Sequence, residues 1–87
     1  MENKVLVKVL VPELERTFDV FIPVNELVWR VRQMIIKVVS DLTGIGIDQK
    51  SPSILINKSS NNIYTNNQVI IDTDIRNGTE LILILKK

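Results

Sequence analysis

The stretch that decides the fold is Glu80-Leu81-Ile82-Leu83-Ile84-Leu85. An aliphatic run of this length is typical of a strand with other strands on both sides, because neither face carries the polar residues of a solvated edge. The preceding sequence, Arg76-Asn77-Gly78-Thr79, is typical of a tight turn. We therefore predict a central strand over residues 80–85.

Two further strands are predicted near the beginning of the chain. In residues 5–11 valine occupies every second position, which is the alternation of a strand with one buried face. Pro12 ends this strand, and residues 17–22 resume the alternation after a polar turn. The two strands are expected to form a hairpin whose core-facing side chains are Val5, Val7, Val9, Val11, Phe18, Val20 and Ile22.

One long helix is predicted after this hairpin. Pro23 ends the second strand, and Asn25 has a side chain suited to cap a helix that begins near residue 26. Gly44 suits the left-handed conformation that follows a last helical turn, so we expect the helix over residues 26–43. Its core stripe, at spacings of three and four, consists of Leu27, Val31, Ile35, Val38 and Leu42, with Val28, Met34 and Val39 along the edges of the stripe.

The remaining segments are short. Residues 53–57 are predicted to form a strand, and the asparagine-rich residues 57–67 a loop with a minimal strand at Ile63 and Tyr64. Residues 69–75 are predicted to form a buried turn or a short helical piece. This order of elements predicts an α+β protein with the β-grasp, or ubiquitin-like, fold. Its mixed sheet of four to five strands would have the last strand parallel to the first and between the first and the third, with the one long helix packed across one face.

The composition excludes most classes of enzyme and of metal site. The 87 residues suffice for one domain, 1–87, and include neither cysteine nor histidine, so a cysteine nucleophile, the usual general base and the usual transition-metal ligands are missing. Eleven basic and ten acidic residues leave a net charge of +1, without the electrostatic signature of nucleic-acid binding. No apolar run is long enough to cross a bilayer, and the amino-terminal sequence lacks the features of a signal peptide. We expect a cytoplasmic, non-catalytic protein with no cofactor, no metal, no nucleic-acid partner and no direct membrane insertion.

Three segments carry a resemblance to known families. Residues 73–85 are similar to the segment that ubiquitin-like domains carry before and within their last strand. Residues 19–23 (Asp-Val-Phe-Ile-Pro) and 75–81 (Ile-Arg-Asn-Gly-Thr-Glu-Leu), with the length of the chain, resemble the YukD/EsaB family of small bacterial ubiquitin-like proteins encoded with type VII (WXG100/Ess) secretion systems. The resemblance implies an accessory or regulatory cytoplasmic role, with components of the secretion machinery as protein partners.

Two other functions stay open. Conjugated ubiquitin-like modifiers and sulfur-carrier proteins finish in a flexible Gly-Gly, which the closing sequence Ile84-Leu85-Lys86-Lys87 does not provide, so this alternative is disfavoured. Small β-grasp effector subunits of larger enzymes, such as oxygenases, are the second alternative. Co-purification with a large catalytic chain would distinguish them.

The candidate partner-binding residues are apolar side chains on faces that the fold leaves open. The resemblance to ubiquitin places Leu55 and Ile84 at the positions of its partner-binding patch, on the sheet face away from the helix. Leu6, Leu10 and Ile82 are expected on the same face, which would then be more apolar than solvent contact requires. The alternatives are a register error of one residue, which exchanges inside and outside, or isolated aliphatic residues that solvent tolerates.

A second candidate surface lies on the helix. Trp29 and Ile36 are expected on the side opposite the core stripe, where they would suit a docking or homodimer site. Alternatively, Trp29 folds over the amino end of the helix onto Phe21 or Pro23. The nearby basic residues are interpreted as a solvated flank and not as an anion site: Arg16, Arg30, Arg32 and Lys37.

Overall fold

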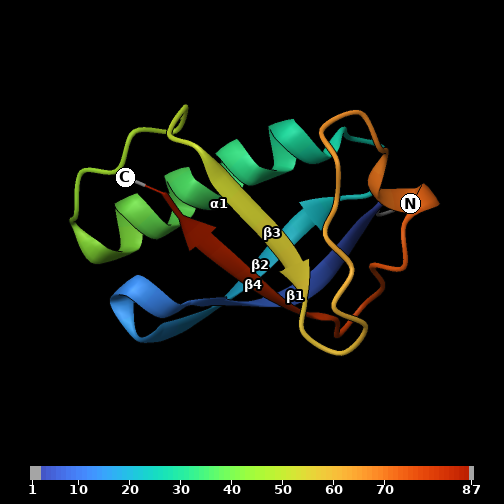
Figure 1. Cartoon of the computed structure of the whole chain (residues 1–87), viewed down its shortest axis with the longest axis horizontal. Coiled ribbons are helices and arrows are strands. Elements are labelled where there is room, and N and C mark those ends of the chain that lie inside the picture. The colour runs from blue at the N-terminus through green and yellow to red at the C-terminus, as the bar shows by residue number, and fades with distance from the viewer. Residues whose placement is uncertain (1–2, 87) are drawn as a thin grey trace.

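A mixed sheet with one helix across one face makes up the chain (Figure 1). The computed structural model describes residues 3–86. Within them, the strands are β1 (Lys4–Val11), β2 (Arg16–Pro23), β3 (Ser53–Asn57) and β4 (Glu80–Leu85). The α-helix is α1 (Val28–Thr43), and single 3-10 turns lie at η1 (Pro12–Leu14) and η2 (Ile70–Asp72).

The strand order confirms the predicted central position of β4. The sheet has the order β2-β1-β4-β3, so β4 lies between β1 and β3. It runs parallel to β1, with Val9 opposite Leu81, and antiparallel to β3, with Leu55 opposite Leu83. β1 and β2 form the antiparallel hairpin. The predicted β-grasp fold is therefore confirmed, with four strands in the sheet of the described residues.

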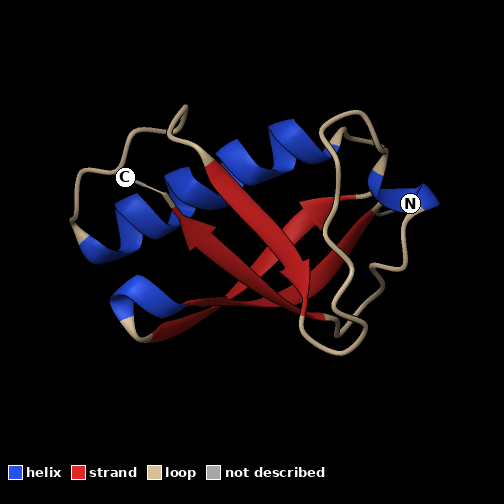
Figure 2. Ribbon diagram, in the orientation of Figure 1, coloured by secondary structure: helices blue, strands red, loops and turns tan. Residues whose placement is uncertain are grey.

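The core lies between α1 and the face of the sheet that α1 covers (Figure 2). In each strand every second side chain enters it, because successive residues of a strand point to opposite faces. The buried apolar residues of the strands are Val7, Val9, Val11, Phe18, Val20, Ile22, Leu55, Leu81 and Leu83. The hairpin faces were thus predicted correctly, except that Val5 is half-buried at the end of β1.

The amino end of α1 differs from the prediction. The helix begins at Val28 and not near residue 26, and the capping position is held by Leu27, whose side chain makes no capping hydrogen bond. A distant segment caps the helix instead, because the Val28 amide donates to the Gln68 carbonyl at 2.9 Å. The carboxyl end follows the prediction, since Gly44 adopts a positive φ of 73° and its amide donates to the Ser40 carbonyl.

The buried stripe of α1 is rotated relative to the predicted one. Leu42 is 62% exposed, so its predicted place in the core was wrong. The helix buries Val28, Val31, Ile35, Ile36 and Val39. Leu42 lies in the last turn of the helix, where less of the sheet is left to cover it.

A network of polar side chains holds the loop between β3 and η2. Asn57 is buried and its Nδ2 donates to the Tyr64 hydroxyl at 3.1 Å. The Tyr64 hydroxyl in turn donates to Asp74, whose carboxylate also accepts hydrogen bonds from Ser60 at 2.8 Å and from Asn62 at 2.9 Å. The Tyr64 bond, opposed by partial burial, lowers the pKa of Asp74. The loop is therefore fixed against the outer edge of β3.

Replacing Tyr64 by Phe should lower the free energy of unfolding by about 1–3 kcal/mol at neutral pH, because Asn57 loses a buried partner. Burial, reinforced by the bond to Asp74, raises the pKa of Tyr64 from 10.0 to about 12. A pKa raised by folding stabilises the native state below the unfolded value, and this contribution is lost as the pH rises from 10.0 to about 12. Urea unfolding at about pH 8 and about pH 11 should therefore show a smaller gap between wild type and Tyr64→Phe at the higher pH. A constant gap would contradict this account.

Candidate functional site

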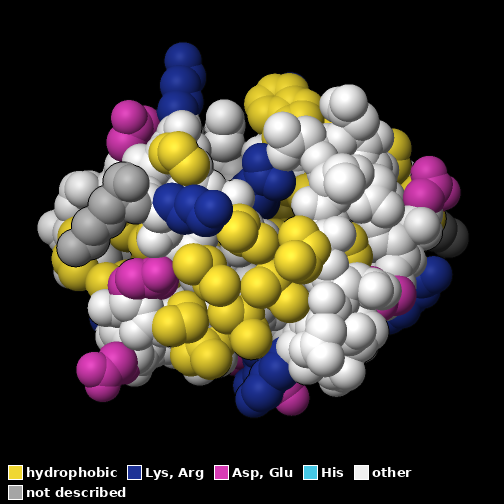
Figure 3. All heavy atoms as spheres, in the orientation of Figure 1, with side chains coloured by type: hydrophobic (Ala, Val, Ile, Leu, Met, Phe, Trp, Pro, Cys, Tyr) yellow, Lys and Arg dark blue, Asp and Glu magenta, His cyan; other side chains and the backbone are white. Residues whose placement is uncertain are grey.

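The side of the sheet that faces away from α1, the open sheet face, carries a contiguous group of aliphatic side chains. Ile82 lies opposite Leu10 of β1 and opposite Ile56 of β3, and Ile84 lies opposite Ile54. Directly opposed residues place their side chains on the same face and in contact range. We call this group, Leu10, Ile54, Ile56, Ile82 and Ile84, the aliphatic patch. Figure 3 shows hydrophobic side chains gathered on this face of the molecule.

Two charged pairs lie together at one end of the aliphatic patch, where Lys8 is opposite Glu80. The Lys8 Nζ lies 3.3 Å from the Asp19 carboxylate, and the Lys58 Nζ lies 3.4 Å from the Glu80 carboxylate. Both pairs are exposed, so they contribute little to stability. An apolar centre with a charged rim is the usual composition of a protein-binding surface.

Three further apolar side chains, Ile63 on one side and Leu6 with Phe21 on the other, extend the open sheet face. Ile63 forms an isolated bridge with Ile56 at the outer edge of β3 and is 63% exposed. On the other side of the Lys8 and Asp19 pair, the half-buried Leu6 lies opposite Phe21, which is 65% exposed. Leu6 therefore occupies the predicted face but stands apart from the aliphatic patch.

The predicted exposure of Leu55 was wrong. Leu55 is fully buried on the side of α1, because it pairs with the buried Leu83. The outward positions of β3 belong to Ile54 and Ile56, which sequence reasoning missed. β3 is aliphatic at three successive positions, 54–56, so its own sequence contains no alternation that could have revealed the face.

The two helix residues do not form the predicted surface. Ile36 is 1% exposed and belongs to the core, because the buried stripe of α1 is rotated toward its flank. Trp29 is 36% exposed, and it lines a groove together with Arg32 of the same helix and with the loop residues Tyr64 and Asn66. It does not line the aliphatic patch.

The described residues contain no group of side chains suited to bind a metal ion and no membrane-spanning helix. Among residues 3–86, no cluster of three or more acidic, histidine or cysteine side chains could hold a metal ion. No helix in the same range is long and apolar enough to span a membrane. What the open sheet face offers is apolar surface, and this can be buried against another protein.

Comparisons with known proteins agree with the fold. Neither a family model nor a curated protein matches the sequence. Among solved structures, a chain of the MycP5-free ESX-5 inner membrane complex is 18% identical with a TM-score of 0.74, covering 97% of this chain and 21% of that one. The EccD5 ubiquitin-like domain from Mycobacterium xenopi is 13% identical with a TM-score of 0.73, over 97% of this chain and 96% of that one. The ubiquitin-like domain of the Mycobacterium tuberculosis type VII secretion protein EccD1 is 17% identical with a TM-score of 0.70, over 93% and 97%.

The protein thus has the fold of the ubiquitin-like domains. Two of these three similar structures are ubiquitin-like domains of EccD proteins, and the chain spans about a fifth of the length of the ESX-5 complex chain that it matches. At identities of 13–18% the likeness is one of fold.

Proposed function

We propose that this chain is a non-catalytic ubiquitin-like module, acting as one domain over residues 1–87, that binds a protein component of a bacterial type VII secretion machinery from the cytoplasmic side. The observation that carries the proposal is the aliphatic patch, where Leu10, Ile82 and Ile56 are opposed in register across three neighbouring strands. The resemblance to YukD/EsaB proteins and the fold likeness to EccD ubiquitin-like domains support the choice of partner.

The patch is suited to binding because its side chains have little to gain from remaining in water. The described residues place no helix or strand over this face, while α1 covers the opposite one (Figure 2). Burial of apolar surface stabilises by about 25 cal/mol per Å², so covering a contiguous patch favours association. Leu6, beside Phe21, lies at the periphery of the same interface in this proposal.

The binding test uses a defined partner. We expect the purified chain to bind the cytoplasmic part of the FtsK-type ATPase of its own type VII locus, measured by calorimetry. Ile84→Asp should weaken this binding by about 100-fold or more, because it places an unpaired charge in a desolvated interface. Urea unfolding of the same variant should change by only about 1 kcal/mol, since Ile84 is half-buried at the surface.

The control is Lys8→Ala at the rim, which should change the affinity by less than about threefold because solvent screens its charge. Binding that is unaffected by Ile84→Asp would refute the patch as the interface. If the chain instead self-associates in sedimentation experiments and Ile84→Asp abolishes this, then a second copy is the occupant. Absence of binding to any component of the locus would refute the type VII assignment.

A further inference from the structure

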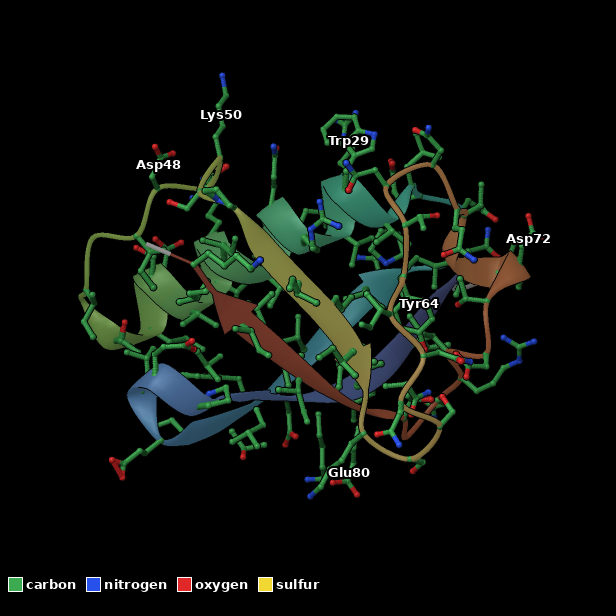
Figure 4. All side chains as sticks on the ribbon, in the orientation of Figure 1. Trp29, Asp48, Lys50, Tyr64, Asp72 and Glu80 are labelled. Atoms are coloured by element: carbon green, nitrogen blue, oxygen red, sulfur yellow. The ribbon has the colours of Figure 1, made fainter. Side chains whose placement is uncertain are left out.

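A second surface, the groove between α1 and the outer edge of β3, is lined from four separate parts of the sequence. Its volume is about 680 Å³. Three basic residues line it: Arg32 of α1, Lys50 in the turn before β3, and Lys86 after β4. Figure 4 shows Trp29 and Lys50 projecting from the same edge of the molecule. We call this surface the basic groove, since none of its described lining residues is acidic.

The three cations of the basic groove lack acidic partners among residues 3–86. Elsewhere in this range four basic side chains form ion pairs, Lys8 with Asp19, Arg30 with Glu26, Lys37 with Asp41 and Lys58 with Glu80, whereas Lys4, Arg16 and Arg76 do not. Arg32 donates instead to the neutral side-chain oxygen of Asn66. Burial also lowers the pKa of Arg32, so its charge is partly desolvated without compensation from a carboxylate. The groove therefore presents positive potential that a carboxylate ligand would neutralise.

The other half of the groove is apolar and borders a free strand edge. Trp29, Ile54 and Ile63 line it. The loop pairs with β3 as far as Leu55, whose carbonyl accepts from the Tyr64 amide at 3.3 Å. Ser53 lies two residues earlier, so its backbone points to the same edge, and in the described part of the chain it has no loop partner there. An extended peptide could pair with this edge while its side chains enter the groove.

We propose that the basic groove binds an extended, acidic segment of a protein partner. Its carboxylates would pair with Arg32, Lys50 and Lys86, and an aromatic or aliphatic side chain would pack against Trp29. An acidic ligand is proposed because its charge complements the three cations of the groove. The apolar half of the groove and the strand edge favour a peptide over a phosphate polymer. With a net charge of +1, the chain lacks the extended basic surface that a nucleic acid requires. The basic groove borders the aliphatic patch at Ile54, which belongs to both, but its three cations and Trp29 lie outside the patch.

The test uses a short capped peptide in which glutamates alternate with valine and phenylalanine, and a matched peptide with glutamine in place of glutamate. Trp29 is the only tryptophan, so its fluorescence reports on the groove directly. The acidic peptide should bind saturably, shift the amide resonances of Arg32 and Ser53, and weaken as salt is added, while the glutamine peptide should not bind. Arg32→Gln and Lys50→Gln should each weaken binding by about tenfold, through loss of a charge-assisted contact.

Two controls separate this site from other surfaces. Lys58→Gln removes a cation that lies outside the groove and should leave the affinity unchanged. Leu10→Asp, in the part of the aliphatic patch on β1 and outside the groove, should also leave it unchanged, which distinguishes failure here from failure of the aliphatic patch. Lys50 is exposed, so Lys50→Gln stays informative even if Arg32→Gln perturbs the fold.

Three results would overturn the proposal. The first is the absence of saturable binding of the acidic peptide, and the second is binding that does not respond to Arg32→Gln or Lys50→Gln. The third is tighter binding of oligothymidine or of phosphatidylglycerol vesicles with the same dependence on these two residues, since the groove would then recognise phosphate.

Discussion

Leu55→Asp should unfold most of the protein at 25 °C, whereas Ile54→Asp should leave it folded. Leu55 is 0% exposed and lies opposite Leu83, so the aspartate would place an unpaired carboxylate in the core. An uncompensated buried charge costs about 3–5 kcal/mol, and the lost leucine packing adds about 2–5 kcal/mol. The sum is comparable to the total stability of a domain of this size, roughly 4–13 kcal/mol.

Ile54 is the matched control because it is the preceding residue of the same strand but points to the open sheet face. We expect Ile54→Asp to cost about 1 kcal/mol, mainly through lower strand propensity. Dispersion of the amide resonances and urea unfolding followed by circular dichroism would measure both variants. A greater loss for Ile54→Asp than for Leu55→Asp would show that the two faces of β3 are exchanged.

Leu83→Ala should lower the free energy of unfolding by about 2–5 kcal/mol. Leu83 is fully buried in β4, one of the two strands with neighbours on both sides, so the surrounding backbone can relax little into the cavity. Each kcal/mol corresponds to a fall of about 4–8 °C in Tm for a domain of this size. Thermal unfolding should therefore show a decrease of about 8 °C or more.

Ile84→Ala provides the comparison, because Ile84 is the next residue of β4 and is half-buried on the open sheet face. Its loss should cost about 1 kcal/mol. Equal losses for Leu83→Ala and Ile84→Ala would mean that β4 is buried equally on both faces, and this would remove the basis for the aliphatic patch.

Much of the fold could be predicted because the deciding signals are local. The valine alternation of residues 5–11 identifies both the strand and its buried face, because every second side chain of a strand points to the same face and here all of these are valine. The aliphatic run of residues 80–85 identifies the central strand, and Gly44 marks the end of the helix. These signals depend on neighbours within a few positions, which the sequence displays directly. They also place Leu10, Ile82 and Ile84 on the open sheet face.

What only the tertiary structure decided depends on contacts between distant segments. Residues 54–56 suit either face, and the pairing of β3 with β4 selected Leu55 for the core and turned Ile54 and Ile56 outward. The amino end of α1 is capped by the backbone carbonyl of Gln68. This residue is distant in sequence, so the residues around Asn25 could not predict the contact. In the same way, the sequence predicts Arg32 to lie on a solvated flank of the helix, whereas in the structure it lines one groove with Lys50 and Lys86. These residues are far apart in the sequence, and only the folding of the chain brings them together.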